Sequence, residues 1–184
     1  GSEMCIRDST RAALINVLKE MGGNIEFTKV KQVSNEEVCN ILVKNSQLKG
    51  ADIGGDIIPS LIDEIPILSI AASFADGKSK ISDIGELRVK ESDRLNAIST
   101  GLDAIGIKNC TDNTSITIEG KTGYIEQIDN IKSFDDHRIA MSFLVAGLRS
   151  KRGIIVNNCE NIVTSYPNFV SDMNQLGSRI DEVK

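Results

Sequence analysis

The sequence predicts a mixed α and β fold in which strands cover apolar helices. Residues 65–75 (IPILSIAASFA) and 139–148 (IAMSFLVAGL) are apolar on nearly all sides, which is typical of helices buried inside a domain. Each leads through a polar turn into a strand-like run, residues 79–84 and 154–158. A second type of helix, which is amphipathic and followed by glycine, alternates with these apolar helices along the chain. We therefore interpret the pattern as an internal repeat of strands and helices.

The other helices and strands follow from local patterns. Residues 10–21 (TRAALINVLKEM) place apolar side chains on one helical face, and a Gly-Gly pair then ends the helix before the alternating residues 24–30. The same order of helix and glycine recurs near Gly106 and Gly177. Residues 39–44 and 115–119 alternate in the manner of half-buried strands, so all these elements fit the mixed fold.

Composition excludes several classes of protein. A chain of 184 residues with 40% hydrophobic content can bury a sizeable core, as one domain or at most two small ones. A net charge of −5 and 4% aromatic residues argue against a nucleic-acid partner. No apolar run reaches the roughly 18 residues that a membrane span requires, so we expect a cytoplasmic protein with no membrane partner.

The cysteines do not suggest a metal site. The four cysteines lie far apart without a C-x-x-C pair, and the single His137 cannot complete a common zinc site alone. We therefore expect reduced thiols, no metal and no cofactor.

One charged stretch stands out within the chain. Residues 86–94 (ELRVKESDR) contain six charges in nine residues, directly before an amphipathic run with helical spacing. The stretch is therefore expected at a helix N-terminus, with Ser92 or Asp93 as the N-cap.

Two interpretations of this stretch are open. The free N–H groups and positive dipole end of a helix favour an anion, and Lys90 and Arg94 would add to that site while Glu91 supplies a carboxyl group for acid–base work. Alternatively, the stretch is a solvated cap held by salt bridges.

Polar clusters precede other predicted helices as well. They are Asp63-Glu64, residues 135–138 (DDHR), and Thr164-Ser165-Tyr166 before a helix begun by Pro167. A fold that points these N-termini at one cleft would suit a small substrate with several anionic groups.

Each cluster also has an ordinary structural explanation. Acids and proline are common in the first turn of a helix, so Asp63 can be an ordinary helix-start residue without a functional role. Asp136 can be a cap that pairs with Arg138, and His137 can be a structural residue. Thr164 fits an ordinary cap. The repetition of unusual charge at one structural position favours a functional site.

Four motifs carry a resemblance to a known family. They are residues 61–75 (LIDEIPILSIAASFA), 87–94 (LRVKESDR), 136–141 (DHRIAM) and 164–169 (TSYPNF). With these motifs in this order and at this spacing, the chain from residue 10 onward resembles the C-terminal half of members of the 5-enolpyruvylshikimate 3-phosphate synthase family.

The resemblance implies a domain organisation. Members of the family have two domains, each built from three βαβαββ units with helices inside and sheet outside, and an active site in the cleft between the domains. By this resemblance residues 10–184 form the C-terminal domain, the N-terminal domain is absent, and residues 1–9 are a tag or a non-native start.

The resemblance also implies an activity. The family transfers the enolpyruvyl group of phosphoenolpyruvate to the 5-hydroxyl of shikimate 3-phosphate and releases phosphate, on the route to chorismate and aromatic amino acids; it is the target of the herbicide glyphosate. The absent N-terminal domain is expected to complete the site, so the isolated chain should be inactive. A non-catalytic stand-alone domain and a UDP-N-acetylglucosamine enolpyruvyl transferase are the alternatives.

Matching positions suggest roles for five residues. Asp63 resembles the base that takes the proton from the attacking hydroxyl, and Glu91 resembles the acid–base group at C3 of phosphoenolpyruvate. Lys90 resembles the lysine that contacts shikimate 3-phosphate. Arg94 and Arg138 resemble the pair that holds phosphoenolpyruvate. We expect these five residues to converge on one open face, with both arginines hydrated.

Four further positions are candidates. Glu86 stands where other members carry an asparagine that contacts shikimate 3-phosphate. Thr164 stands where some members carry a lysine that contacts phosphoenolpyruvate. Asp136 and His137 lie in the DHRIAM motif and complete the set.

Overall fold

The computed structural model describes residues 3–4, 12–33, 36–126 and 130–183. The helices are α1 (Ala13–Glu20), α2 (Ile65–Ser73), α3 (Arg94–Ala104), α4 (His137–Ala146), α5 (Ile162–Ser165) and α6 (Phe169–Gln175). The strands are β1 (Glu3–Met4), β2 (Asn24–Val33), β3 (Glu36–Lys44), β4 (Asp52–Ile53), β5 (Lys78–Ile81), β6 (Asn109–Thr111), β7 (Ile116–Glu119), β8 (Ile131–Lys132) and β9 (Val156–Asn157). The predicted mixed α and β class is confirmed.

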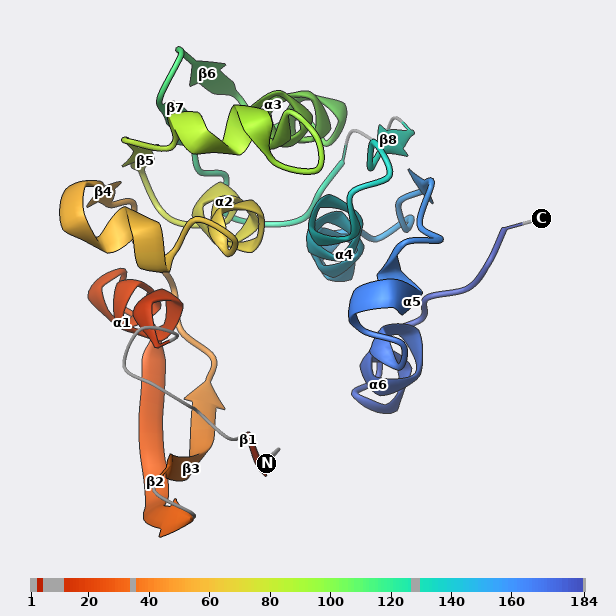
Figure 1. Cartoon of the computed structure of the whole chain (residues 1–184). Helices are drawn as coiled ribbons and strands as arrows, with labels where there is room; N and C mark the ends of the chain where they lie inside the picture. The colour runs from red at the N-terminus through yellow and green to blue at the C-terminus, as the bar shows by residue number, and fades with distance from the viewer. Residues whose placement is uncertain (1–2, 5–11, 34–35, 127–129, 184) are drawn as a thin grey trace.

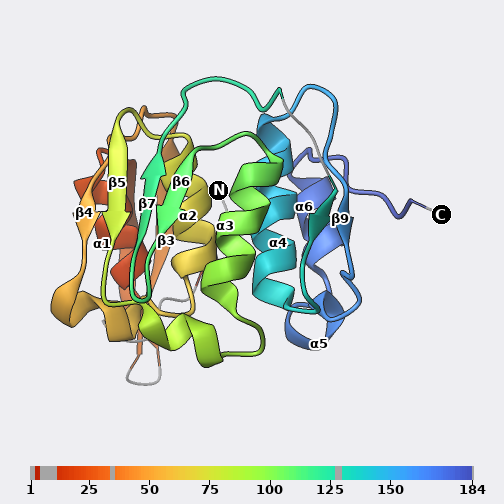
Figure 2. The ribbon, with the colours of Figure 1, turned by 90° about the horizontal axis from the view of Figure 1, so that it is seen from above.

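Two of the three sheets lie against the central helices. The largest has the order β4-β5-β7-β6 and covers α2 and α3, while the parallel pair β8-β9 lies beside α3 and α4 (Figures 1 and 2). Within the large sheet, β4 and β5 are parallel and the other pairs are antiparallel. Strands therefore pack against α2, α3 and α4, and the finer expectation of repeated units with sheets covering buried helices stays a prediction.

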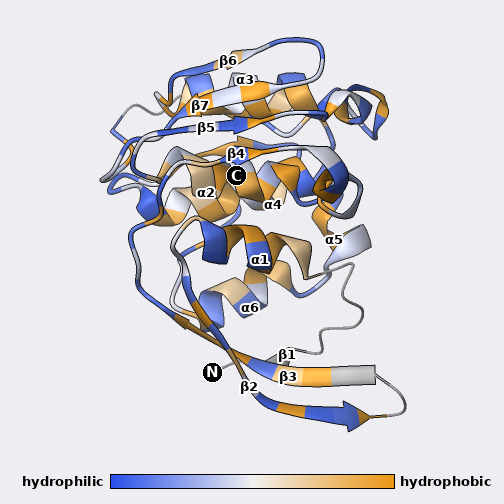
Figure 3. Ribbon diagram, turned by 90° about the vertical axis from the view of Figure 1, so that its left-hand side faces the viewer, coloured by the Kyte–Doolittle hydropathy of each residue, from blue (hydrophilic) through white to orange (hydrophobic). Residues whose placement is uncertain are grey.

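The third sheet, β1-β3-β2, extends away from the helices (Figure 3). The register of β2 against β3 shifts between Thr28 and Lys31, and Lys29 at this bulge has a φ of +52°. Strand β2 forms one edge of the sheet. Exposed apolar side chains on this hairpin include those of Phe27 and Val43.

Helix α2 is the centre of the core. Seven of its nine residues are buried, including Ser69 and Ser73. Both hydroxyls are satisfied within the helix, because Ser69 donates to the carbonyl of Ile65 and Ser73 to the carbonyl of Ser69. An apolar helix with internally paired hydroxyls can be buried on several sides without unpaired polar groups.

Several boundaries differ from the predicted ones. The strand expected at residues 79–84 is β5, which ends at Ile81, and the strand expected at 154–158 is only the short β9. The helix predicted to begin at Pro167 is wrong: α5 already contains Thr164, and α6 begins at Phe169. The backbone explains the error, since Tyr166 at the end of α5 has a φ of −140° and a ψ of 80°, which are not helical. A residue before proline is disfavoured in the helical region, and Pro167 then lies in a turn before α6.

Some expectations lie partly outside the described residues. Of residues 1–9, only Glu3–Met4 are described, and the start of the first predicted helix is not. The internal repeat stays a prediction. In the described parts, no helix is long and apolar enough to cross a membrane.

A testable contact joins α3 to α4. Gly101 lies buried in the middle of α3, and a Cβ atom there would lie only 2.2 Å from Cζ of the Phe143 ring on α4. Alanine normally stabilises a helix by about 1 kcal/mol relative to glycine. Here we expect Gly101→Ala to lower the free energy of unfolding by about 1–3 kcal/mol through overpacking. Urea denaturation measures this change, and Phe143→Leu in the same chain should recover part of the loss. A gain in stability would contradict the contact.

Candidate functional site

Three helices begin at one place in the fold. Asp93 caps α3 by accepting from the N–H of Asn96, and Asp136 caps α4 by accepting from the N–H groups of Arg138 and Ile139. Asp63 lies just before α2, and its carboxylate contacts the first residue of α3. The predicted clustering of helix N-termini is therefore present for α2, α3 and α4.

The Arg94 side chain is the hub of this cluster. It is 0% exposed, and each nitrogen of its guanidinium faces a carboxylate. Nε donates to Asp136 at 2.8 Å, Nη1 donates to Asp63 at 3.0 Å, and Nη2 lies 2.5 Å from Oε2 of Glu91. The expectation that Arg94 is hydrated is wrong, because three segments pack around it.

The Nη2 atom is paired differently from the other two nitrogens. It is buried and forms no hydrogen bond to the described residues, although the Glu91 carboxylate is close enough for an ion pair. The Glu91 side chain is 55% exposed, whereas Arg94 is buried. An exposed carboxylate at the one nitrogen without a directed hydrogen bond marks the side of Arg94 where another anion could bind.

Asp136 holds Arg94 from the opposite side. Its carboxylate is fully buried and also accepts from the Ser92 hydroxyl at 3.1 Å. Burial alone would raise the pKa of Asp136, but the hydrogen bond and charge of Arg94, the N–H of Arg138 and the Ser92 hydroxyl together hold this pKa below its usual value. Burial likewise opposes the charged form of Arg94, and Asp136, Glu91 and Asp63 keep its pKa raised.

An unusual loop brings Asp136 to this position. Phe134 and Asp135 both have left-handed φ angles, +57° and +58°, which cost about 1–2 kcal/mol each for non-glycine residues. Two asparagines hold the loop: Asn161 donates to the Asp135 carbonyl, and Asn158 donates to its carboxylate. The backbone strain is thus balanced by side chains from the segment that follows β9.

Lys90 and Arg138 line the outer part of the cluster. Lys90 pairs with Glu86 at 2.5 Å and lies 3.9 Å from Asp63. The hydrogen bond that Lys90 donates to the Glu86 carboxylate raises the pKa of Lys90 above its ordinary value. Arg138 donates to the backbone carbonyl of Asp63 at 3.0 Å, and its side chain is 34% exposed. These two cations are the accessible ones.

Acidic groups outnumber basic groups here. Within the described part of the chain, five carboxylates and three cations belong to the cluster, so its net charge is about −2. The carboxylates are those of Asp63, Glu64, Glu86, Glu91 and Asp136, and the cations are Lys90, Arg94 and Arg138. An anion that enters this site must displace a carboxylate or bring further cations.

The structure thus brings together the five residues to which the sequence suggests roles, and adds Glu86 and Asp136. The side chains of Asp63 and Glu91 are partly exposed, as expected. The roles themselves stay predictions.

The other two candidates stand apart from the Arg94 contacts. His137 is a half-buried first residue of α4. Thr164 is exposed, and its hydroxyl donates to the Asn161 carbonyl. Among the described residues, no hydrogen bond or ion pair joins either side chain to Arg94.

Sequence reasoning missed the part played by Ser92. It was a candidate N-cap, but Asp93 caps α3 and the Ser92 hydroxyl donates to Asp136, 44 residues further along the chain. The only signal in the sequence is a hydroxyl between two charged residues, which does not indicate a distant partner.

Comparisons with known proteins agree on one family. Residues 3–173 match the family model described as EPSP synthase (3-phosphoshikimate 1-carboxyvinyltransferase). The 3-phosphoshikimate 1-carboxyvinyltransferase of Thermoanaerobacter sp. (strain X514) is 46% identical over 180 residues, which are 96% of this chain and 42% of that protein. The same enzyme of Geobacter sulfurreducens is 42% identical over 97% of this chain and 42% of its own length.

Solved structures give the same result. An EPSP synthase structure from Acinetobacter baumannii superposes with a TM-score of 0.91 and 36% identity, and the match covers 100% of this chain and 44% of that one. The enolpyruvyl transferase NikO from Streptomyces tendae shares the fold, with a TM-score of 0.70 at 20% identity. The chain therefore spans less than half the length of the relatives that it matches.

The Asp136–Arg94 pair makes the stability depend on pH. Because the pKa of Asp136 is lowered in the folded state, its contribution is complete above the ordinary value of 3.8 and is lost as the pH falls through the lower folded value. We expect Asp136→Asn to reduce the free energy of unfolding at pH 7 by about 3–5 kcal/mol, since Arg94 would lose its fully buried partner and keep only the partly exposed Asp63 and Glu91. The difference from the unmodified chain should shrink below pH 3.8.

Urea denaturation at pH 7 and near pH 3 measures this dependence. The control is Asp93→Asn, which keeps a good N-cap on α3 and removes only the partly exposed ion pair with Arg88, so it should cost less than about 1 kcal/mol. An equal loss for Asp136→Asn at both pH values would show that the effect does not come from the buried charge pair.

Proposed function

The chain belongs to the EPSP synthase family, and from this premise we propose that it provides one half of an active site for 3-phosphoshikimate 1-carboxyvinyltransferase activity. The reaction moves the enolpyruvyl group of phosphoenolpyruvate to the 5-hydroxyl of shikimate 3-phosphate and releases phosphate. The observation that carries the proposal is the arrangement of two accessible carboxylates, Asp63 and Glu91, on the two terminal nitrogens of the buried Arg94.

Two carboxyl groups with separate tasks suit this reaction. A proton must be added to C3 of phosphoenolpyruvate and later removed with the loss of phosphate, and a second group must accept the proton of the attacking hydroxyl. We assign the C3 position to Glu91 and the hydroxyl to Asp63. Both carboxylates touch the same guanidinium, so their charges are coupled.

Arg94 and Arg138 are the proposed holders of phosphoenolpyruvate. A guanidinium presents a planar fork of donors that matches a carboxylate or a phosphate. Glu91 contacts the Nη2 nitrogen of Arg94. A substrate anion that takes this place would release Glu91 toward the reacting carbon, so binding would also prepare the acid–base group. Lys90 would contact shikimate 3-phosphate.

Charge supports the view that this is only half of the site. Both substrates carry several negative charges, whereas the cluster itself has a net charge of about −2. The remaining cations must come from elsewhere, and the chain spans only 42% of its Thermoanaerobacter relative. Holding two substrates in register can supply roughly 7–11 kcal/mol of barrier reduction, which one open half cannot provide.

The finer description of the domain belongs to the same proposal. We take residues 10–184 as part of the C-terminal domain, in which α2 and α4 occupy equivalent places in repeated βαβαββ units. Both are apolar, and both begin at the Arg94 cluster.

A turnover assay tests the proposed function. The chain is mixed with the part of the Thermoanaerobacter relative that lies outside the match, and phosphate release is measured with both substrates. We expect no turnover by the chain alone and turnover in the mixture. Asp63→Ala or Glu91→Gln should lower the rate by about 10²–10⁴, the usual contribution of an acid–base group.

The matched control is Glu160→Gln, which changes an exposed glutamate outside the cluster and should leave the rate unchanged. Robust turnover by the lone chain would refute the half-site proposal. A mixture that is inactive with every variant would favour a non-catalytic domain.

Weak anion binding by the lone chain is a further prediction. We expect phosphoenolpyruvate to bind with a millimolar dissociation constant, about 4 kcal/mol, because Lys90 and Arg138 are accessible while Arg94 is already paired. Chemical-shift titration measures the affinity. Arg138→Ala should abolish binding, and Arg152→Ala, an exposed arginine in the turn before β9, should not. Unchanged binding by Arg138→Ala would place the ligand elsewhere.

A further inference from the structure

The residues that lead into α3 have no apolar anchor of their own. Residues 88–93, which we call the Glu91 segment, run from the end of the 3-10 helix η3 (Gly85–Val89) to the start of α3. Leu87 before the segment and Arg94 after it are both 0% exposed, whereas none of the side chains between them is buried. Polar contacts must therefore fix the position of this segment.

Arg88 joins both ends of the Glu91 segment to a neighbouring turn. Its Nε donates to the Asn113 carbonyl at 3.1 Å, and its Nη2 donates to the Asp112 carbonyl at 2.6 Å. Its Nη1 donates at 3.0 Å to the carboxylate of Asp93, at the other end of the segment. A planar guanidinium holds several acceptors in fixed directions, whereas a lysine ammonium is a point charge on a flexible stem. One side chain thus closes the segment on itself and ties it to the turn.

The turn that accepts these bonds is fixed by its own contacts. The Asp112 carboxylate accepts from the N–H of Thr114 at 2.8 Å and from the Ser115 hydroxyl at 2.7 Å, and these two bonds hold the pKa of Asp112 below its usual value. The Thr114 carbonyl accepts from the N–H of Ile84. The turn also joins the paired strands β6 and β7 of the largest sheet. It is therefore a firm support for Arg88.

Other contacts hold the Glu91 segment at single points. One is the hydrogen bond from the Ser92 hydroxyl to Asp136. Another is the contact between the exposed Glu91 and Arg94, which lacks a directed hydrogen bond. Among the described residues, Arg88 alone connects the two ends of the segment to one support.

The proposed holders of phosphoenolpyruvate do not depend on Arg88. Arg94 is held by its hydrogen bond to the buried Asp136, and Arg138 donates to the backbone carbonyl of Asp63. Loss of the Arg88 contacts should therefore loosen the Glu91 segment and leave these two arginines in place.

We propose that Arg88 is a positioning residue, which holds the Glu91 segment so that Glu91 and Lys90 meet the substrates in a fixed geometry. The inference deepens the proposed function and rests on it. Arg88 acts through the backbone of its own segment and touches no reacting atom. Reaction rates are sensitive to such positioning, because a misplacement of about 1 Å can cost about a hundredfold. The side chain of the acid–base group is exposed, while its backbone is constrained.

Backbone motion in the 184-residue chain tests this role without catalysis. Arg88→Lys keeps the charge but cannot reproduce the three directed bonds. NMR relaxation of the amides of residues 89–92 measures the effect. We expect their order parameters to fall from about 0.85, the value of a rigid backbone, to below about 0.6 in this variant.

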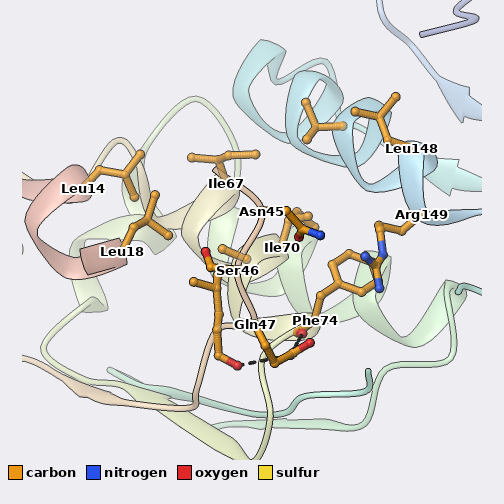
Figure 4. A pocket seen from close by; sticks show the side chains of 13 residues that line it. Leu14, Leu18, Asn45, Ser46, Gln47, Ile67, Ile70, Phe74, Leu148 and Arg149 are labelled. Atoms are coloured by element: carbon orange, nitrogen blue, oxygen red, sulfur yellow. Dashed lines mark hydrogen bonds between the residues drawn. The ribbon is translucent and has the colours of Figure 1, made fainter. Parts of the chain in front are cut away.

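The matched control is Arg149→Lys. Arg149 also donates to a backbone carbonyl, that of Gly123, but it lies beside the Phe74 ring in an apolar pocket, at the opposite end of α2 from the Arg94 cluster (Figure 4). This variant should leave the order parameters of residues 89–92 unchanged.

The turnover assay of the mixture tests the catalytic consequence. For Arg88→Lys we expect kcat to fall at least about tenfold, because Glu91 is no longer held in place. The KM for shikimate 3-phosphate should rise, because Lys90 lies on the same segment, while the KM for phosphoenolpyruvate should change less than about twofold. A general loss of structure would not separate the two substrates in this way.

Asp93→Asn supplies a second variant in case Arg88→Lys does not fold, as judged by circular dichroism. It keeps a good N-cap on α3 and removes only the ion pair with Arg88, so the same changes should appear at smaller size. Order parameters or kinetics equal to those of the unmodified chain in every folded variant would overturn the proposal, and so would an equal rise of both KM values. An inactive mixture of unmodified parts would refute the proposed function instead, and the order parameters alone would then decide whether Arg88 holds the segment.

Discussion

A buried guanidinium is the constraint on which the rest of the site depends. Moving a charge from water into a protein interior is costly unless opposite charges and hydrogen bonds surround it. Arg94 meets this requirement with carboxylates from three separate segments, Asp63, Glu91 and Asp136. The starts of α2, α3 and α4 must therefore stay together for the fold to be stable, and this requirement also keeps the accessible carboxylates in place.

The same constraint divides the cluster into a fixed side and an adjustable side. Asp136 is buried, and its carboxylate accepts hydrogen bonds from the N–H groups at the start of α4, the Ser92 hydroxyl and the Arg94 guanidinium. It therefore cannot turn without leaving these donors unpaired. Glu91 is exposed and makes a contact without a directed hydrogen bond. A site of this kind can exchange one anion for another while Arg94 keeps its orientation.

Much of this could be predicted from the sequence, for identifiable reasons. Charges placed just before apolar runs predicted which residues would meet, because helix starts are encoded locally. The burial of Arg94 could not be predicted in this way, since it depends on partners 31 and 42 residues away. Local patterns also could not decide between Ser92 and Asp93 as the cap. They placed a helix start at Pro167, because the pattern does not show that α5 runs to Ser165 and leaves Pro167 in the turn before α6.

The bulge in β2 has a consequence for how this protein behaves when concentrated. An edge strand offers unpaired N–H and C=O groups on which another chain can build a continuous ladder, which is how ordered aggregates begin. Lys29, with its left-handed φ, interrupts the extended backbone of β2, and Lys31 follows it with a second charge. Strand-to-strand growth between molecules would therefore be confined to the short stretch before the bulge. The irregularity therefore disfavours use of this exposed, partly apolar hairpin as a template for fibres.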